Sequence, residues 1–108
     1  MLKVFQVKRG STFSFIVNFK NLNQDVSSMT LGLKEDYDFP MLIEKTIGDG
    51  ITKIETGKYK VDFSYTDILG LEAGMYIYDL RYTVGDTPSI PLSGYILVNE
   101  SVFNNQED

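Results

Sequence analysis

The sequence contains no cysteine, no histidine and no tryptophan. Without cysteine the chain can form neither a disulfide framework nor a cysteine-based zinc site. The absence of histidine removes the commonest metal ligand and the commonest general base of enzymes. We therefore expect a domain that is held together by side-chain packing alone, with no cofactor.

Long hydrophobic runs and an excess of positive charge are also missing. No stretch approaches the roughly 20 apolar residues that cross a membrane, and charged residues interrupt the first nine positions, unlike a secretory signal. Ten Lys and Arg against fifteen Asp and Glu give a net charge of −5. Phosphate backbones are bound mainly by Lys and Arg. We expect no membrane and no nucleic acid as partners, and synthesis in the cytoplasm, with later export left open.

Alanine, the best helix former, occurs once, as Ala73, whereas tyrosine and phenylalanine occur seven times each. Aromatic and β-branched residues suit the half-buried surface of a sheet. A chain of 108 residues is long enough for one domain. We expect an all-β domain over residues 1–99 and a flexible acidic C-terminal tail over residues 100–108.

Alternating apolar and polar residues predict short strands separated by turn-forming residues. The expected strands are 2–8, 12–19, 29–34, 41–47, 51–55, 58–64, 75–84 and 92–99. Residues 64–69 fit one helical turn, with Ser64 or Thr66 as its N-cap. Gly48-Asp49-Gly50 fits a hairpin turn. About seven or eight antiparallel strands with close turns indicate a sandwich or a barrel.

The alternation also assigns faces to the strands. One set of aromatic rings is expected to point into a single interior: Phe13, Phe15, Phe19, Tyr59, Phe63, Tyr76, Tyr78 and Tyr82. Met75 and Ile77 then point outward beside Asp79 and Arg81, which leaves a partly apolar strip as a candidate assembly surface. The reverse arrangement would expose the tyrosines and bury charges.

One local motif favours the sandwich. Leu71-Glu72-Ala73-Gly74-Met75-Tyr76 leads directly into the long strand. In immunoglobulin-like sandwiches a tyrosine near the start of the sixth strand sends its hydroxyl back to the backbone a few residues upstream. We therefore expect an antiparallel immunoglobulin-like β-sandwich with Tyr76 in such a corner.

Residues that could carry chemistry are few. The acidic stretch 35–38 lacks the ligand order of a calcium loop, so we interpret it as a solvated turn. Serine, threonine and lysine are present, but no histidine or cysteine could activate them, and a cleft for paired carboxylates is not indicated. We assign no catalytic, cofactor-binding or metal-binding residues and expect no enzymatic activity.

Three segments together carry a family resemblance: Gly10-Ser11-Thr12-Phe13, the stretch from Leu71 through Gly74, Tyr76 and Tyr78 to Leu80, and Pro91 to Val98. Across roughly residues 4–98 the chain resembles small immunoglobulin-like virion proteins of tailed bacteriophages and prophages. It is similar to the N-terminal domain of phage baseplate upper proteins. That resemblance implies a structural module that attaches a tail or baseplate part, usually as an oligomer, and it transfers no functional residue.

Two functions follow as hypotheses. The first is a non-enzymatic assembly module of a phage or prophage particle, located in the virion. It would contact other virion proteins and copies of itself through edge strands and apolar surfaces. Lys3, Lys8 and Arg9 could bind the acidic end of another copy, although dispersed solubility charges explain them equally well. The alternative is an immunoglobulin-like module that recognises a glycan or peptide through exposed aromatic residues, for which the candidates are Tyr37, Phe39, Tyr65 and Tyr95.

Overall fold

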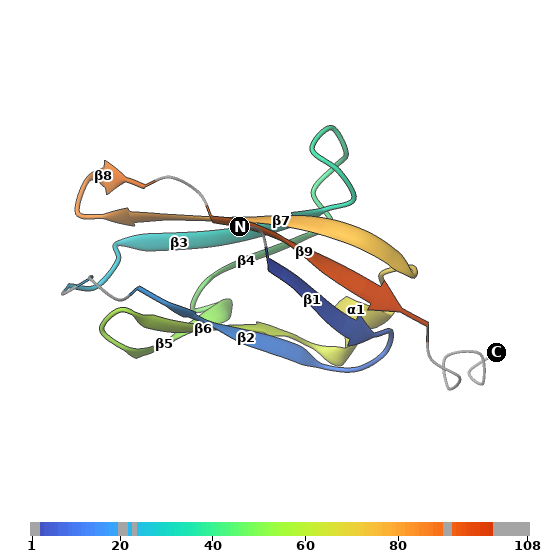
Figure 1. Cartoon of the computed structure of the whole chain (residues 1–108). Coiled ribbons are helices and arrows are strands. Elements are labelled where there is room, and N and C mark those ends of the chain that lie inside the picture. The colour runs from blue at the N-terminus through green and yellow to red at the C-terminus, as the bar shows by residue number, and fades with distance from the viewer. Residues whose placement is uncertain (1–2, 20–21, 23, 90–91, 101–108) are drawn as a thin grey trace.

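Strands form nearly all of the regular structure (Figure 1). The computed structural model describes residues 3–19, 22, 24–89 and 92–100. The elements are β1 (Lys3–Lys8), β2 (Phe13–Asn18), β3 (Ser28–Lys34), β4 (Ile43–Ile47), β5 (Gly50–Glu55), β6 (Lys58–Phe63), α1 (Tyr65–Leu69), β7 (Gly74–Val84), β8 (Thr87–Pro88) and β9 (Leu92–Asn99). The predicted all-β class is confirmed. Within the described part of the chain, no helix is long and apolar enough to cross a membrane.

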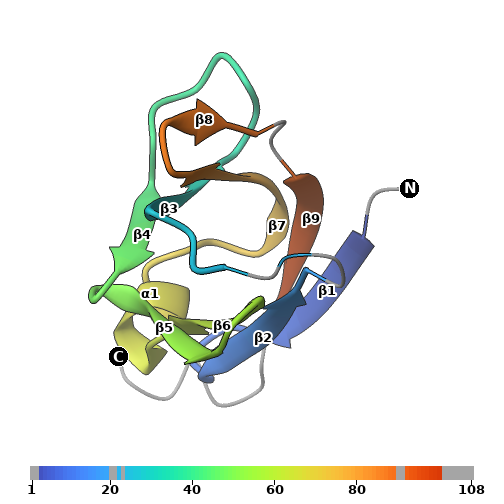
Figure 2. The ribbon, with the colours of Figure 1, turned by 90° about the vertical axis from the view of Figure 1, so that its left-hand side faces the viewer.

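The strands follow the order β1-β9-β7-β3-β4-β5-β6-β2, and the two-residue strand β8 pairs with β7. Viewed along the strands, this sheet curls almost into a barrel (Figure 2). One layer contains β1, β9, β7 and β3, and the other contains β5, β6 and β2. Strand β4 lies at the side where the two layers join.

The expected antiparallel pairing is confirmed for most strand pairs, and two pairs depart from it. Strand β1 runs parallel to β9, from Lys3 beside Gly94 to Lys8 beside Asn99. Strands β4 and β5 also pair in parallel, at Thr46 with Gly50 and at Ile47 with Ile51. The first pair joins the two strands at opposite ends of the chain, within one layer. In the second pair the chain passes from one layer to the other, so the consecutive strands β4 and β5 do not form a hairpin. The sheet is therefore mixed.

The segment Gly48-Asp49-Gly50 is the clearest case. It forms a tight turn, since Asp49 N donates to Thr46 O at 2.9 Å and both glycines have positive φ, 90° and 100°. Those angles are unfavourable for residues with a Cβ, so the glycines are required there. The turn leads into β5, which pairs antiparallel with β6. The predicted turn is confirmed, and its role as a β4–β5 hairpin is wrong.

The core contains the rings that the alternation placed inside. Tyr59, Phe63, Tyr76 and Tyr78 are buried, and Phe13, Phe15, Phe19 and Tyr82 are partly buried and pack against the same cluster. Phe5 from β1 adds a ring, with centroids 5.2 Å from Phe13 and 4.8 Å from Phe15. Because β1 and β2 are the end strands of the sheet, these rings close the gap between the layers where no backbone pairing does.

The tyrosine corner is present. Tyr76 Oη donates to Glu72 O at 2.6 Å. Burial raises the pKa of Tyr76, so its hydroxyl remains a donor at neutral pH. Just upstream, Ser64 precedes α1 as its N-cap. The Ser64 side chain accepts a hydrogen bond from Asp67 N, and Ser64 N donates one to Asp67 Oδ2. This capping box confirms the predicted helical turn and selects Ser64 as the N-cap.

Candidate interaction surface

The larger layer has one face that points away from the core, which we call the outer face. It carries apolar side chains and charged side chains of both signs. It consists of the side chains of β9, β7, β3 and β4 that point away from the core. Cross-strand pairing places them in rows: Tyr95 beside Ile77 and Lys34, and Ser93 beside Asp79, Gly32 and Glu44. A third row contains Arg81, Thr30 and Thr46. Apolar and charged residues of both signs thus alternate along the strands.

The β3–β4 connection, residues 35–42, lies over this face and forms a groove of about 260 Å³. The groove is lined by Thr30, Gly32, Lys34, Tyr37, Met41, Glu44, Ile77, Asp79 and Arg81. Met41 lies directly over Gly32, since a Cβ at Gly32 would come 2.6 Å from Met41 Sδ. A glycine at this position of β3 therefore allows the connection to approach the sheet.

Ile77 does not behave as the sequence predicted. The expected strip of exposed Met75 and Ile77 is half correct, because Met75 is 49% exposed but Ile77 is only 6% exposed. Ile77 nevertheless lies outside the core cluster and lines the groove. The connection that carries Tyr37 and Met41 lies over this face. It covers the Ile77 side chain, which is therefore buried although it points away from the core.

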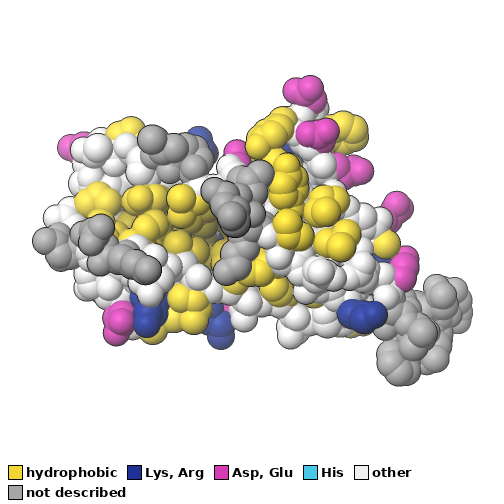
Figure 3. Space-filling view, viewed as in Figure 1, with side chains coloured by type: hydrophobic (Ala, Val, Ile, Leu, Met, Phe, Trp, Pro, Cys, Tyr) yellow, Lys and Arg dark blue, Asp and Glu magenta, His cyan; other side chains and the backbone are white. Residues whose placement is uncertain are grey.

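Exposed apolar side chains concentrate on the connection itself. Tyr37, Phe39, Met41 and Leu42 are 59%, 48%, 49% and 44% exposed. Figure 3 shows hydrophobic side chains on this projecting segment and on the sheet beside it, with acidic residues at its tip. Apolar side chains interspersed with charges resemble the composition of protein–protein interfaces, whose cores are apolar and whose rims are polar.

Polar contacts hold the face in place. Ser93 Oγ donates to Asp79 Oδ1 at 2.5 Å, which links β9 to β7. Lys34 Nζ donates to Tyr37 O at 3.3 Å and connects the end of β3 to the connection. At the other end of β3, the hydroxyls of Ser28 and Thr83 are 2.7 Å apart. The groove is thus built on hydrogen-bonded strands.

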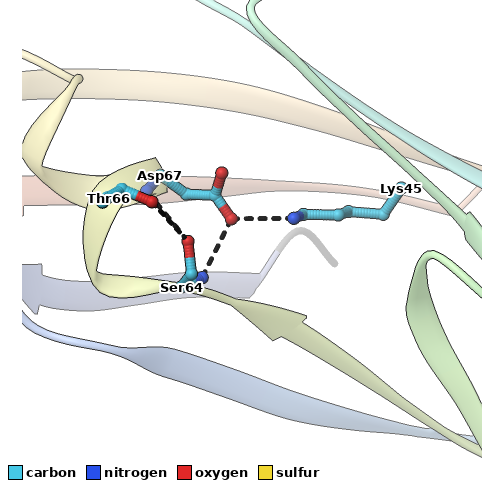
Figure 4. A network of polar contacts seen from close by, with 4 residues as sticks. All are labelled: Lys45, Ser64, Thr66 and Asp67. Atoms are coloured by element: carbon cyan, nitrogen blue, oxygen red, sulfur yellow. Dashed lines mark hydrogen bonds and ion pairs between the residues drawn. The ribbon is translucent and has the colours of Figure 1, made fainter.

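A second polar cluster ties β4 to α1 (Figure 4). Lys45 Nζ lies 2.7 Å from Asp67 Oδ2, and the same oxygen accepts from Ser64 N at 2.9 Å. Burial alone would raise the pKa of Asp67, but hydrogen bonds from Lys45 and Ser64 outweigh it, so the pKa lies below its usual value. The Lys45 ammonium also lies 5.7 Å from the centre of the Phe63 ring. These contacts give the pair a positioning role, since they fix β4 where the layers join.

The four aromatic residues proposed for ligand binding lie at different places on the molecule. Tyr37 and Phe39 lie on the connection, and Tyr95 lies on the outer face opposite Ile77. Tyr65 is 47% exposed but belongs to α1, between β6 and β7. The fold therefore brings three of the four candidates to one side of the molecule.

Among the charged candidates, Arg9 has intramolecular partners. Arg9 Nε donates to Leu71 O at 2.8 Å, and Arg9 Nη1 lies 3.9 Å from Glu100. In the acidic stretch, Asp36 Oδ1 accepts from Tyr37 N at 2.7 Å, as in a turn. Across the described positions, no three Asp, Glu, His or Cys residues are grouped as metal ligands would be. Of the predicted tail, residues 101–108 lie outside the described part.

Sequence reasoning missed the groove and the Lys45–Asp67 pair. Both depend on contacts between residues that are distant in the sequence, so no local pattern indicates them. Lys45 and Asp67 are 22 positions apart. Met41 contacts Gly32 only because the connection folds back over the sheet. The spacing Ser64-x-x-Asp67 was a signal for the capping box alone.

No protein-family model matches the sequence, and no curated protein does. Solved structures do match in fold. One is an AA10 lytic polysaccharide monooxygenase from Streptomyces lividans, with a TM-score of 0.57 and 9% identity. The match covers 88% of this chain and 59% of the monooxygenase, so this chain spans less than two thirds of that protein. Another is the natural killer cell receptor Nkp44, with a TM-score of 0.50 and 14% identity, covering 92% of this chain and 99% of the receptor chain.

At such identities the likeness concerns the fold alone. With the strand order and the tyrosine corner, it makes this chain an immunoglobulin-like β-sandwich. This part of the resemblance is confirmed. Immunoglobulin-like folds host many functions, which depend on the residues at their surfaces.

Proposed function

We propose that this chain is a non-enzymatic interaction module that binds another protein through its outer face. The observation that carries the proposal is the β3–β4 connection, which projects exposed Tyr37, Phe39 and Met41 beside a groove containing charges of both signs. Exposed aromatic and methionine side chains are enriched at protein interfaces. The composition supports this proposal, because no histidine or cysteine is available to activate a nucleophile.

We further propose that the partner is a virion protein and that the module belongs to the tail or baseplate of a phage or prophage particle. This placement depends on the sequence resemblance alone. Genes for tail, tape-measure or baseplate proteins next to the gene for this chain would support the placement.

The binding face is tested with Met41→Glu, which puts a charge among the exposed apolar side chains of the β3–β4 connection. The matched control is Ile54→Glu on β5, a residue of nearly equal exposure, 48%. Binding to purified tail and baseplate proteins is measured by surface plasmon resonance. We expect Met41→Glu to weaken binding about tenfold or more, as for an interface hot spot, and Ile54→Glu to leave it unchanged. Equal affinities for both variants would refute the outer face as the binding surface.

The alternative function, recognition of a glycan or peptide, is favoured by one observation. Tyr37 is 59% exposed at the groove, and Tyr95 lies on the same face. Glycan and peptide arrays would then give signals that are lost in Tyr37→Ala and Tyr95→Ala but kept in Tyr65→Ala. Arrays without any signal would remove this alternative.

A further inference from the structure

The end strand β2 has an edge without the usual protection against pairing. It pairs with β6 on one side and ends the strand order on the other. Its sequence, Phe-Ser-Phe-Ile-Val-Asn, contains no charged residue, no proline and no glycine. Natural edge strands commonly carry charges, proline or a bulge that prevent pairing with another chain. The opposite end strand, β1, has a lysine at each end of its span, Lys3 and Lys8.

The backbone of β2 offers hydrogen bonds to a partner. Phe19 N donates to Gly57 O at 2.7 Å, and the β2–β6 register continues from this pair without interruption. In an antiparallel pair, successive residues direct their N–H and C=O groups to opposite sides. The groups of Phe13, Phe15 and Val17 therefore point to β6, and those of Ser14, Ile16 and Asn18 point to the open side.

The side chains of β2 also leave apolar surface uncovered. Ile16 on the outward side is 56% exposed. Phe13, Phe15 and Val17 on the inward side are only partly buried, although they pack against the core. Between this strand and the other layer lies a hollow of about 140 Å³, lined by Phe5, Phe15, Ile16, Val17, Tyr78, Leu80 and Leu92. Figure 3 shows hydrophobic side chains between the two layers on this side of the molecule.

We infer that β2 pairs with β2 of a second copy of this chain, antiparallel about a two-fold axis. Ile16 then lies opposite Ile16 of the second copy, and Ser14 lies opposite Asn18. In this register the N–H and C=O groups of Ser14, Ile16 and Asn18 on the open edge of β2 all form hydrogen bonds with the second copy. The core-facing side chains of β2 lie on the same face of the joined sheet in both copies. A two-fold contact requires a strand that is complementary to itself. Because β2 is uncharged throughout, no like charges face each other across this pair.

This inference goes beyond the proposed function, because it names a contact between copies of this chain, as the sequence resemblance implied. It uses a different surface from the outer face, so the two can fail separately. If Met41→Glu abolishes partner binding while the dimer persists, the proposed partner face and the β2 contact are both supported. If partner binding is lost only together with the dimer, the proposed function depends on assembly.

The test uses two substitutions at one exposed position. Ile16→Pro removes only the outward N–H, which proline tolerates in an edge strand, and Ile16→Lys adds a like charge at the two-fold axis. The control is Val4→Lys on the opposite end strand, since Val4 is 50% exposed. Sedimentation equilibrium over a wide concentration range measures self-association, and circular dichroism with thermal unfolding verifies that each variant is folded.

We expect a dimer for the unmodified chain and for Val4→Lys, and a dissociation constant at least about tenfold higher for both Ile16 variants. Amide hydrogen exchange gives a second readout: exchange at Ser14, Ile16 and Asn18 should slow as concentration rises. A monomer at every concentration, a dimer that survives both Ile16 variants, or a dimer lost in Val4→Lys instead would each overturn the inference.

Discussion

At the scale of single residues, the hydroxyl of Tyr76 fixes the point where the chain enters its longest strand. It donates to Glu72 O at 2.6 Å from a buried ring. Tyr76→Phe keeps the ring and leaves that carbonyl without its donor, so we expect a loss of about 1–2 kcal/mol in unfolding free energy. Urea unfolding followed by circular dichroism measures it. Tyr65→Phe, at an exposed ring on α1, is the control and should change little; equal losses would contradict the role of the corner.

Lys45 and Asp67 make the connection between β4 and α1 sensitive to acid. The pKa of Asp67 is lowered from 3.8 in the folded chain, so the pair's contribution is complete above that value and is lost as pH falls through the folded pKa. We expect Asp67→Asn to cost about 1–3 kcal/mol at neutral pH, because Lys45 is only 14% exposed and loses its counterion. The difference from the unmodified chain should shrink below about pH 4.

The control for this pH profile is Asp25→Asn. Asp25 pairs with Lys53 at 2.8 Å, but both side chains are well exposed, 53% and 43%. Exposed ion pairs contribute little because water and salt screen them. Thermal unfolding of both variants from acid to neutral pH separates the two cases. If the difference in stability between Asp67→Asn and the unmodified chain did not change with pH across this range, the ion pair would not stabilise the fold.

At the scale of elements, two glycines show that the neighbours of a strand determine whether it accepts a larger side chain. A Cβ at Gly94 in β9 would lie 2.6–2.7 Å from the Tyr78 ring, which is held in the core. A Cβ at Gly32 in β3 would lie 2.6 Å from Met41 Sδ, the end of a flexible and half-exposed side chain. The overlap is the same, but only Met41 can move away.

We therefore expect Gly94→Ala to destabilise the fold by about 1–3 kcal/mol, as for an overpacked core. Gly32→Ala should remain within about 0.5 kcal/mol of the unmodified chain, like most surface substitutions, while it displaces the β3–β4 connection. Urea unfolding gives the energies, and the NMR signal of the Met41 methyl group reports the displacement. Similar losses for the two variants would show that the connection is as rigid as the core.

At the scale of the whole molecule, alternation in the sequence predicted the strands other than the two-residue β8, and it predicted which of their side chains point inward. The boundaries of β9 agree with the prediction, and Tyr59, Phe63, Tyr76 and Tyr78 are buried as expected. Alternation depends only on nearest neighbours in the chain, so it assigns a face but not a neighbouring strand. The parallel pairing of Lys3 with Gly94 joins segments from opposite ends of the chain and has no local signal.

The candidate surface was less predictable for the same reason. The outward direction of Ile77 followed from its position in β7, but its burial depends on how residues 35–42 fold back over the sheet. A connection of this kind is positioned by contacts such as Met41 with Gly32, which periodicity does not encode. Exposed Tyr37 and Phe39, by contrast, were recognisable in the sequence as loop aromatics.

The parallel pairing of β1 with β9 has a mechanical consequence. Lys3 lies beside Gly94 and Lys8 beside Asn99, so the first residue of β1 and the last residue of β9 stand at opposite ends of the pair. Tension applied at these two points slides the strands past each other and loads all their hydrogen bonds at once. Single-molecule stretching should therefore give a high rupture force, lowered when Val7→Pro removes one of the shared bonds.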